Sequence, residues 1–523
     1  MKTLAELFDR AAAAGTPVIA GDGTVTAAEI AAEAARVAGA LRELGVRRGD
    51  RVAAWLPNLP QSLSLYAACG RLGAILVAVN TRFGAAEIAD VVGRSEARVL
   101  VAATAPGDAG LAPLPDVQAA SIRGLRHLVV VGAPPPAEPL WPHVENIAYD
   151  QMAAAPAMTG CDGGGSDLAN IFTTSGTTSA PKFAAHRQDA VVGHACDVAR
   201  TLEFGMDGAV SLQLLPFCGV FGFVQALAAL AAPAPIVMPP AIDAEAAVGL
   251  ARRHRATHLF ASDDLIHRML EAAPEARPFP DLRYCLFAGF NTWLTDLPAR
   301  AEARGVPMIA PFGMSEVFAI FAARPADARH PDKHRAGGTL VNGEARVRVR
   351  DPETGDLLGD GETAELEISS PHMFAGYFGD PDATAAAMTP DGYLRTGDLG
   401  YTEPGNAFTY LQRIGDTLRL GGFLVAPAEI EAAVVAHPAV ADAQVVAAGT
   451  AAGNRPVAFV IAATGGQVDE ADVIAHCRGR LPKFKTPVRV AGIEAFPVTH
   501  GPNGTKVQRK RLRRMAEELL AEP

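Results

Sequence analysis

Short apolar segments alternate with longer alanine-rich segments in the first half of the chain, and this alternation restricts the fold more than any other feature. Residues 51–56 (RVAAWL) and 74–80 (AILVAVN) are mostly apolar runs that predict buried strands. Residues 29–45 and 65–73 have the length and alanine content of helices. Buried strands that alternate with helices are typical of parallel sheets with helices on both faces.

The character of the sequence changes after about residue 346. Residues 347–369 predict β-hairpins, because the turn sequences PETGD and GDGE separate short strands. From about residue 418 the chain predicts a strand, a helix, two strands and a second helix before a basic tail. We therefore expect an α/β fold: a large amino-terminal domain of parallel and mixed sheets flanked by helices, with a β-rich subdomain, and a small carboxy-terminal α+β domain.

Composition and charge exclude several classes of protein. A chain of 523 residues with 49% apolar residues is long enough for two or more domains. A net charge of −11 argues against a nucleic-acid partner. The cysteines include no C-x-x-C pair and have no histidine cluster beside them, so neither a disulfide framework nor a zinc site is expected. They are Cys69, Cys161, Cys196, Cys218, Cys285 and Cys477.

Two segments bear on targeting and on membranes. Glu6 and Asp9 interrupt the first 18 residues, which therefore do not resemble a signal peptide. Residues 209–241 carry no charge and are long enough to span a bilayer. Pro216 and Pro233 divide that segment, and it is expected to form a buried strand, helix and strand. We expect a cytoplasmic protein without a transmembrane segment.

Residues 172–182 read FTTSGTTSAPK, a run of hydroxyl side chains that ends in a lysine. A Walker loop has two glycines and a lysine directly before a serine or threonine. Here Gly176 stands alone and Phe183 follows Lys182, so the Walker pattern is absent. Taken alone, the segment is compatible with a solvated turn as well as with a different phosphate-binding loop.

Four later stretches, in order, accompany this loop: PFGMSEV (311–317), GYLRTGDLGY (392–401), RIGDTLRLGGFLVAPAEIE (413–431) and PNGTKVQRKRLR (502–513). Together the five resemble the motifs of the adenylate-forming superfamily, which includes acyl-CoA synthetases, aryl-CoA ligases, peptide-synthetase adenylation domains and luciferases. The resemblance extends over nearly the whole chain. It implies a first domain of residues 1–412 that binds AMP and the acyl group, and a mobile lid domain of residues 413–523.

The resemblance also implies which residues bind the nucleotide. The loop at 172–182 would hold the β- and γ-phosphates of ATP, Glu316 would bind Mg²⁺, Ser315 would contact the α-phosphate, and Asp398 would accept the ribose hydroxyls. The full implied set is Thr174, Ser175, Gly176, Thr177, Thr178, Lys182, Ala288, Gly289, Phe290, Phe312, Gly313, Asp398 and Arg413. Phe312 and the loop 288–290 would lie against the adenine. Ser179 and Phe183 stand where relatives have glycine.

The lid domain would carry the catalytic lysine. The resemblance assigns this role to Lys506, whose ammonium group would bridge the carboxylate and the α-phosphate, with Lys510 as an alternative. The lid would then rotate about a hinge at Gly415, supported by Asp416, to open a tunnel for coenzyme A. The tunnel wall would be Gly421 and Gly422, where the absence of side chains leaves room.

The segment PFCGVFG (216–222) departs most from the relatives, which carry histidine or an aromatic residue at the position of Gly219. The resemblance places Phe217, Gly219, Phe221 and Val317 at the acyl pocket. No acidic residue occurs between Asp207 and Asp243, which disfavours an α-amino acid substrate.

We therefore expect an AMP-forming acyl-CoA synthetase that uses ATP, Mg²⁺ and coenzyme A. Its acid is expected to be apolar: aliphatic, alicyclic or aryl. Two alternatives stay open at this point: an acyl-AMP ligase that loads a carrier protein, and a catalytically silent homologue that binds a nucleotide or acyl-CoA. A homodimer is compatible with the sequence.

Overall fold

The structure is a computed structural model of the whole chain. It describes every residue except 22, 104–110, 112–113, 175–180, 240–242, 290–293, 295, 326–333, 415–417, 421–422, 426, 451–452, 464–467, 502–503 and 522–523. For residues 419, 423–424, 450, 453, 500–501 and 504–506 it describes the backbone alone.

An eight-stranded sheet forms the first layer of the large domain, in the order β20-β9-β8-β4-β3-β5-β6-β7. The six strands from β8 to β7 are parallel, whereas β9 and β20 pair antiparallel at one edge. The strands are β3 (Arg51–Trp55), β4 (Ile75–Ala78), β5 (Val99–Ala103), β6 (His127–Val131), β7 (Glu145–Ala148), β8 (Leu168–Thr173), β9 (Phe183–Arg187) and β20 (Gly376–Tyr377). The predicted strands at 51–56 and 74–80 are confirmed.

A second sheet of seven strands has the order β14-β13-β12-β10-β11-β1-β2, and all of its pairs are parallel except β1 with β2. Its strands are β1 (Pro17–Ala20), β2 (Gly23–Thr26), β10 (Ser211–Leu212), β11 (Ile236–Met238), β12 (His258–Ser262), β13 (Tyr284–Ala288) and β14 (Met308–Ile309). The two largely parallel sheets confirm the predicted α/β class.

Helices cover both faces of both sheets, so the layers run helix, sheet, helix, sheet, helix. The central layer holds α1 (Leu4–Ala13), α2 (Ala27–Glu43), α3 (Pro60–Leu72), α6 (Gln188–Thr201) and α7 (Val220–Ala231), which share one apolar core with both sheets. The first sheet turns its other face to α4 (Ala85–Arg94), and the second to α8 (Ala244–Arg253), α9 (Asp263–Ala272) and α10 (Leu297–Ala303). A short helix, α5 (Tyr149–Ala153), follows β7.

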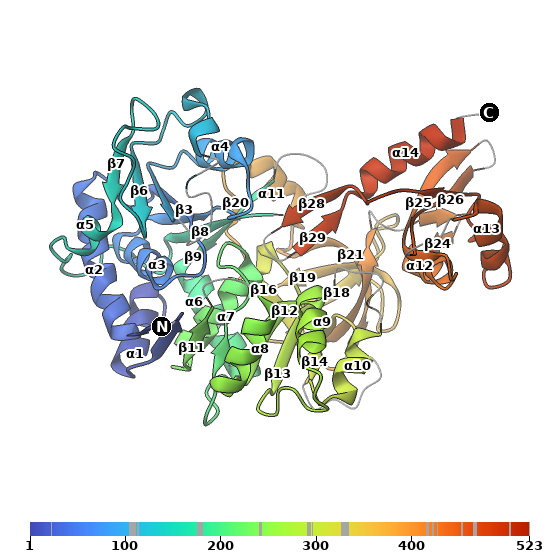
Figure 1. Ribbon diagram of the computed structural model, residues 1–523, viewed down its shortest axis with the longest axis horizontal. Helices are drawn as coiled ribbons and strands as arrows, with labels where there is room; N and C mark the ends of the chain where they lie inside the picture. Colours follow the sequence, from blue (N-terminus) through green and yellow to red (C-terminus); the bar gives the residue numbers. More distant parts are fainter. Residues whose placement is uncertain are drawn as a thin grey trace.

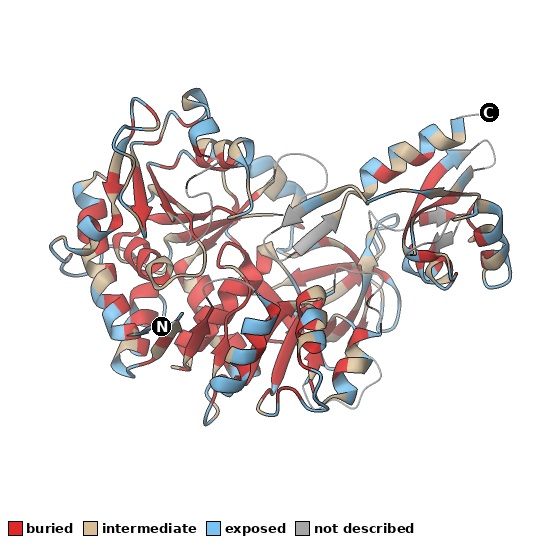
Figure 2. Ribbon diagram, in the orientation of Figure 1, coloured by how far each residue is buried: buried red, intermediate tan, exposed pale blue. Residues whose placement is uncertain are grey.

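Helix α7 explains the uncharged segment at 209–241. Every residue of α7 is buried, and the helix lies in the middle of the large domain (Figure 1, Figure 2). Its one polar side chain, Gln225, donates hydrogen bonds to the Ser211 hydroxyl at 3.0 Å and to the Leu212 carbonyl at 2.9 Å. The predicted order of strand, helix and strand is confirmed by β10, α7 and β11. In the part of the chain that the structure describes, no helix combines the length and apolarity needed to cross a bilayer.

A third sheet of seven antiparallel strands adjoins these layers, in the order β15-β16-β17-β22-β21-β19-β18. It confirms the hairpin-rich region expected after residue 346. The strands are β15 (Phe312–Met314), β16 (Ala319–Ala323), β17 (Gly337–Leu340), β18 (Arg346–Arg350), β19 (Ala364–Ser369), β21 (Leu394–Glu403) and β22 (Ala407–Arg413), and helix α11 (Pro381–Ala387) lies between β20 and β21 in the chain. The predicted domain boundary at 412/413 falls one residue before the end of β22 and stays a prediction.

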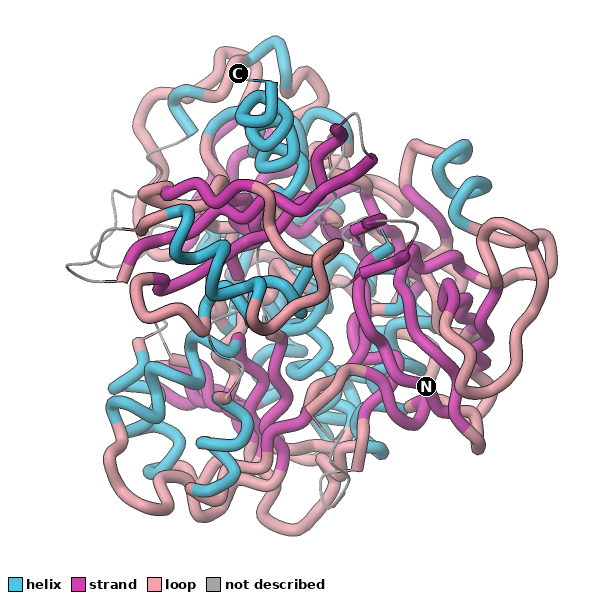
Figure 3. The backbone as a smooth tube through the Cα atoms, turned by 90° about the vertical axis from the view of Figure 1, so that its right-hand side faces the viewer, coloured by secondary structure: helices cyan, strands magenta, loops and turns pink. Residues whose placement is uncertain are grey.

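The small domain stands apart at the carboxy-terminal end (Figure 1), and it faces the viewer in Figure 3. Its elements are β23 (Leu418–Leu420), β24 (Phe423–Val425), α12 (Pro427–Val435), β25 (Val440–Thr450), β26 (Gly453–Ala462), α13 (Glu470–Arg478), β27 (Arg489–Gly492), β28 (Val498–Gly501), β29 (Gly504–Val507) and α14 (Arg509–Ala521). The basic tail expected from the sequence forms helix α14, because Leu512 and Ala516 give it one buried apolar face.

Candidate active site

A tight hairpin between β15 and β16 positions Glu316. The single turn of 3-10 helix at Ser315–Val317 is followed by Phe318 and Ala319, whose φ values are 54° and 78°. A left-handed backbone is costly for residues other than glycine, and such residues concentrate at functional sites. Gly313 permits the close approach of the two strands, since a Cβ atom there would lie 1.4 Å from the Ala319 carbonyl oxygen. The hairpin holds the Glu316 side chain in a buried position.

Tyr377 connects Glu316 to Lys182. The Tyr377 hydroxyl donates a hydrogen bond of 2.6 Å to Glu316 Oε1. Lys182 Nζ lies 4.6 Å from the centre of the Tyr377 ring, within the range of a cation–π contact. Burial and the Glu316 carboxylate both raise the pKa of Tyr377 well above its usual value, so its hydroxyl remains a hydrogen-bond donor. A carboxylate and an ammonium group are thereby held on opposite parts of one side chain.

The base of the predicted phosphate loop is well defined. Thr174 N donates to the Lys182 carbonyl at 2.9 Å, and Lys182 N donates to Thr174 Oγ1 at 3.2 Å, so the two ends of the loop are fastened together. Ser175, Gly176, Thr177, Thr178 and Ser179 lie outside the described residues. Phe183, which stands where relatives have glycine, begins β9 and is buried, with the Arg94 guanidinium 4.3 Å from the centre of its ring.

Asp398 and Arg413 face each other on the neighbouring strands β21 and β22. Arg413 Nη1 donates to Asp398 Oδ1 at 2.9 Å, and the Asp398 carboxylate is buried. Burial opposes the charge of Arg413, but the Asp398 carboxylate and, more weakly, Glu316 raise its pKa. The charges of Asp398 and Glu316, the carboxylates proposed to bind the ribose and the metal, therefore both favour the charged form of Arg413.

The predicted adenine-binding residues occupy two places. Phe312 is buried in β15, its ring centre 5.0 Å from that of Phe408 and 5.6 Å from that of Tyr410. Ala288 ends β13, and Gly289 follows it at the carboxyl end of a parallel strand, where ligands of open α/β sheets usually bind. Phe290 lies outside the described residues.

The predicted acyl-pocket residues are all buried. Gly219 is the residue that precedes α7, and Asn58 fixes the segment before it by accepting from Phe217 N and donating to the Leu215 carbonyl, both at 2.8 Å. The Phe221 ring stacks on Phe260 at 5.2 Å. Val317 belongs to the Glu316 hairpin, and the hairpin meets α7 through Phe318 and Phe223, whose ring centres are 6.5 Å apart. The acyl-pocket assignment stays a prediction.

The proposed catalytic lysine lies on a separate hairpin. The backbone of Lys506 pairs with Thr499 between β29 and β28, and this two-stranded ribbon projects from the small domain toward the large one (Figure 1). The alternative lysine, Lys510, is exposed on α14. Gly415, Asp416, Gly421 and Gly422, the proposed hinge and tunnel residues, lie outside the described residues.

The sequence analysis missed Tyr377. Its segment FAGYFGDP (374–381) contains a single charged residue, Asp380, and no motif that would mark a binding site. A signal was present all the same: a tyrosine between two glycines, directly before an aspartate–proline helix start, indicates a short fixed strand.

Comparison with known proteins shows the family of the chain. Residues 7–378 match the family described as AMP-binding enzyme, and residues 429–501 match the AMP-binding enzyme C-terminal domain. The sulfoacetate–CoA ligase of Cupriavidus necator is 30% identical over 498 residues, which cover 93% of this chain and 92% of that protein. The 4-coumarate–CoA ligase 3 of Oryza sativa is 27% identical over 505 residues, covering 93% of this chain and 86% of that protein.

Among solved structures, ATP-bound MatB from Rhodopseudomonas palustris superimposes with a TM-score of 0.82 at 27% identity, covering 98% of this chain and 99% of that one. The matched profiles span the Glu316 hairpin, Lys182 and Tyr377 in the large domain and most of the small domain. The chain belongs to the AMP-binding enzyme family.

Proposed function

We propose that the protein is an ATP-dependent acid–CoA ligase. A carboxylic acid attacks the α-phosphorus of ATP to form an acyl-adenylate and pyrophosphate, and the thiol of coenzyme A then displaces AMP to give the acyl-CoA. One observation supports the proposal above the others: Lys182, Glu316 and the Asp398–Arg413 ion pair come from three distant segments of the chain. Tyr377 contacts both Lys182 and Glu316, and the charges of Asp398 and Glu316 both act on Arg413.

The residues fit a magnesium–nucleotide complex. Mg²⁺ prefers carboxylate and phosphate oxygens, and Glu316 offers a buried carboxylate that shares Tyr377 as a neighbour with Lys182 at the base of the phosphate loop. The ion would neutralise charge on the phosphates. Glu316 would hold it, Lys182 would bind the departing pyrophosphate, and Asp398 with Arg413 would bind the ribose.

Lys506 would complete the site from the small domain. Adenylation brings two anions together, so a cation that bridges the carboxylate and the α-phosphate would lower the barrier. The proposed boundary at 412/413 and a hinge at Gly415 would let the domain 413–523 carry this lysine in and then withdraw it. Gly421 and Gly422 would line the tunnel for coenzyme A.

The acid is proposed to be apolar beyond its carboxylate, because Phe217, Phe221 and Val317 supply apolar surface and no acidic residue lies between Asp207 and Asp243. The names of the relatives cover a wider range, from sulfoacetate to 4-coumarate. The substrate panel must therefore include charged as well as apolar acids.

Pyrophosphate release by the purified protein tests this function. The protein is incubated with ATP, Mg²⁺ and a panel of fatty, alicyclic, aryl and sulfonated acids, each with and without coenzyme A. Release that depends on one class of acid, with AMP and a thioester formed only when coenzyme A is present, is the expected result. Acid-dependent release without thioester formation favours the ligase that loads a carrier protein, and no release from any acid favours the silent homologue.

A cytoplasmic location is also proposed, because the spacing of the cysteines does not predict a disulfide framework, and a homodimer is proposed because it is compatible with the sequence. Light scattering of the purified protein at two concentrations checks the oligomeric state, and fractionation of the cells that produce it checks the location.

A further inference from the structure

The backbone of residues 374–377 is hydrogen-bonded to two elements of the proposed phosphate site: the hairpin that carries Glu316 and strand β9, which follows Lys182. Phe374 N donates to the Glu316 carbonyl at 2.8 Å, and Ala375 N donates to the Ala185 carbonyl at 2.7 Å. The following residues form β20, which pairs with β9 so that Tyr377 lies opposite Ala184. A stretch of four residues is therefore bonded to the hairpin of Glu316 and to the strand that begins one residue after Lys182.

The Tyr377 side chain has little freedom within this segment. Its backbone N–H donates to Thr384 Oγ1 of α11 at 2.8 Å, and its ring centre lies 5.0 Å from that of Phe374. Gly376 has a φ of 139°, and a Cβ atom there would lie 3.0 Å from the Thr384 side chain, so glycine suits this position. Helix α11 and Phe374 together fix the direction in which the tyrosine points.

The Glu316 carboxylate and the Lys182 ammonium group contact different parts of the Tyr377 side chain. The hydroxyl donates to Glu316 Oε1, and the ring lies against the Lys182 ammonium. We propose that Tyr377 is a positioning residue for ATP activation, which orients the Glu316 carboxylate toward the metal through its hydroxyl and keeps Lys182 beside the phosphates through its ring. The inference rests on the proposed function, because it assigns Glu316 to the metal and Lys182 to the phosphates.

The two contacts can be separated by substitution. Tyr377→Phe removes the hydroxyl and keeps the ring, whereas Tyr377→Leu removes both. Binding of the non-cleavable analogue α,β-methylene-ATP is measured by calorimetry over a series of Mg²⁺ concentrations, without any acid. For Tyr377→Phe we expect the Mg²⁺ concentration at half-maximal binding to rise about tenfold, the usual cost of losing an outer hydrogen bond to a metal ligand. For Tyr377→Leu we expect a further loss of about threefold in nucleotide affinity at saturating Mg²⁺.

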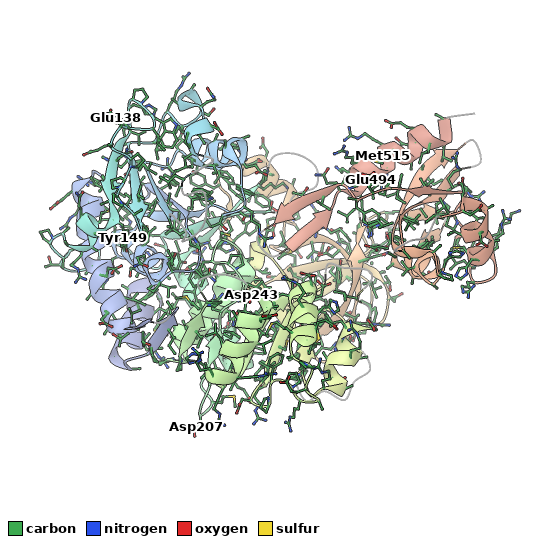
Figure 4. All side chains as sticks on the ribbon, in the orientation of Figure 1. Glu138, Tyr149, Asp207, Asp243, Glu494 and Met515 are labelled. Atoms are coloured by element: carbon green, nitrogen blue, oxygen red, sulfur yellow. The ribbon has the colours of Figure 1, made fainter. Side chains whose placement is uncertain are left out.

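Tyr149→Phe is the matched control. Tyr149 also donates its hydroxyl to a glutamate, Glu33 Oε1, at 2.7 Å, and it is also buried. Tyr149 follows β7, and β7 and β20 are the two opposite edge strands of the eight-stranded sheet. In Figure 4, Tyr149 lies at the left of the large domain, away from the small domain. The loss of a buried phenol–carboxylate bond there should leave the Mg²⁺ dependence of nucleotide binding unchanged. Melting temperatures of all variants separate positioning from a loss of folding.

The results distinguish this inference from the proposed function. If Tyr377→Phe needs no more Mg²⁺ than the wild type and Tyr149→Phe, the positioning role is wrong, even when the wild type activates an acid. If the Mg²⁺ requirement of Tyr377→Phe rises while the wild type activates no acid in the panel, the positioning role stands and the ligase function is wrong. A rise that also occurs in Tyr149→Phe would overturn the inference, because it would reflect general loosening of the fold.

Discussion

Two hairpins carry Glu316 and Lys506, two groups proposed to act on ATP, and the two hairpins are built differently. The hairpin β15–β16 that holds Glu316 is part of a seven-stranded sheet with a buried core beneath it. The hairpin β28–β29 that holds Lys506 pairs, among the described strands, only with itself. A two-stranded ribbon gains little stability from its own pairing, so its position depends on the domain that bears it. The Glu316 carboxylate is therefore held in place by its own sheet, whereas the position of Lys506 is proposed to depend on movement of the small domain.

The largest expected effect comes from replacing Lys506. Lys506→Ala should lower the rate of acyl-adenylate formation by about a thousandfold, because it removes a charge that acts mainly in the transition state. Thioester formation from supplied acyl-adenylate should be nearly unchanged. Single-turnover assays of the two half-reactions measure this difference.

Lys510→Ala is the control for that experiment, since Lys510 is exposed on α14 only four residues away. It should leave both half-reactions unchanged. Equal loss of both half-reactions in Lys506→Ala, or selective loss of adenylation in Lys510→Ala, would contradict the assignment.

Replacement of Glu316 should give the next largest effect. Glu316→Gln keeps the shape of the side chain and an oxygen that can accept from Tyr377, but it removes the charge. Acid-dependent pyrophosphate release should fall about a hundredfold, the upper range for the loss of a group that binds or orients a metal. Glu33→Gln, which alters the carboxylate partner of Tyr149, should retain activity. If Glu316→Gln releases pyrophosphate at the wild-type rate, the assignment of the metal site to this hairpin is wrong.

Asp398→Asn should act on ATP binding more than on turnover. The change weakens the pair with Arg413 and one proposed contact to the ribose, so KM for ATP should rise about tenfold, as expected for a hydrogen bond to a charged group. Asp391→Asn, which breaks the ion pair with Arg348 at 2.6 Å on the same sheet, should leave KM unchanged. Steady-state kinetics of both variants decide the point.

The smallest expected effect is on stability. Ala319 has a φ of 78°, so Ala319→Gly should raise the free energy of unfolding by about 1 kcal/mol by relieving backbone strain in the Glu316 hairpin. The φ of Ala323, at the end of the same strand, is not positive, and glycine there should lower the stability by about 1 kcal/mol. Urea unfolding of the two variants tests the difference. A loss of stability in both would mean that the strain is absent.

The sequence predicted well whatever depends on local pattern. Hydrophobic period and proline positions were enough to predict several elements: the strands near residues 51 and 74, the helix near residue 29 and the buried segment at 209–241. The family motifs also led to the fold. Tyr377 was not predicted, since its contact with Glu316 joins residues 61 positions apart and depends on a strand of only two residues.

The surroundings of the lysine motif show a second limit. Arg509 belongs to the basic tail predicted from the sequence, and its Nη2 lies 2.9 Å from the Glu431 carboxylate of α12, which is buried. That partner lies 78 residues earlier in the chain, beyond the reach of any local pattern. The sequence indicates which residue types are charged, whereas only the packed fold shows which of them already have a partner.

Strand β20 also has a consequence for synthesis of the chain. It covers the outer edge of β9, yet it lies 189 residues further along the chain than the end of β9 at Arg187. At ordinary rates of translation, that edge leaves the ribosome roughly 10–40 s before its partner does. Throughout that interval, unpaired backbone groups of β9 can bond to another nascent chain. Formation of β20 therefore also ends the period in which the edge of β9 is open to such pairing.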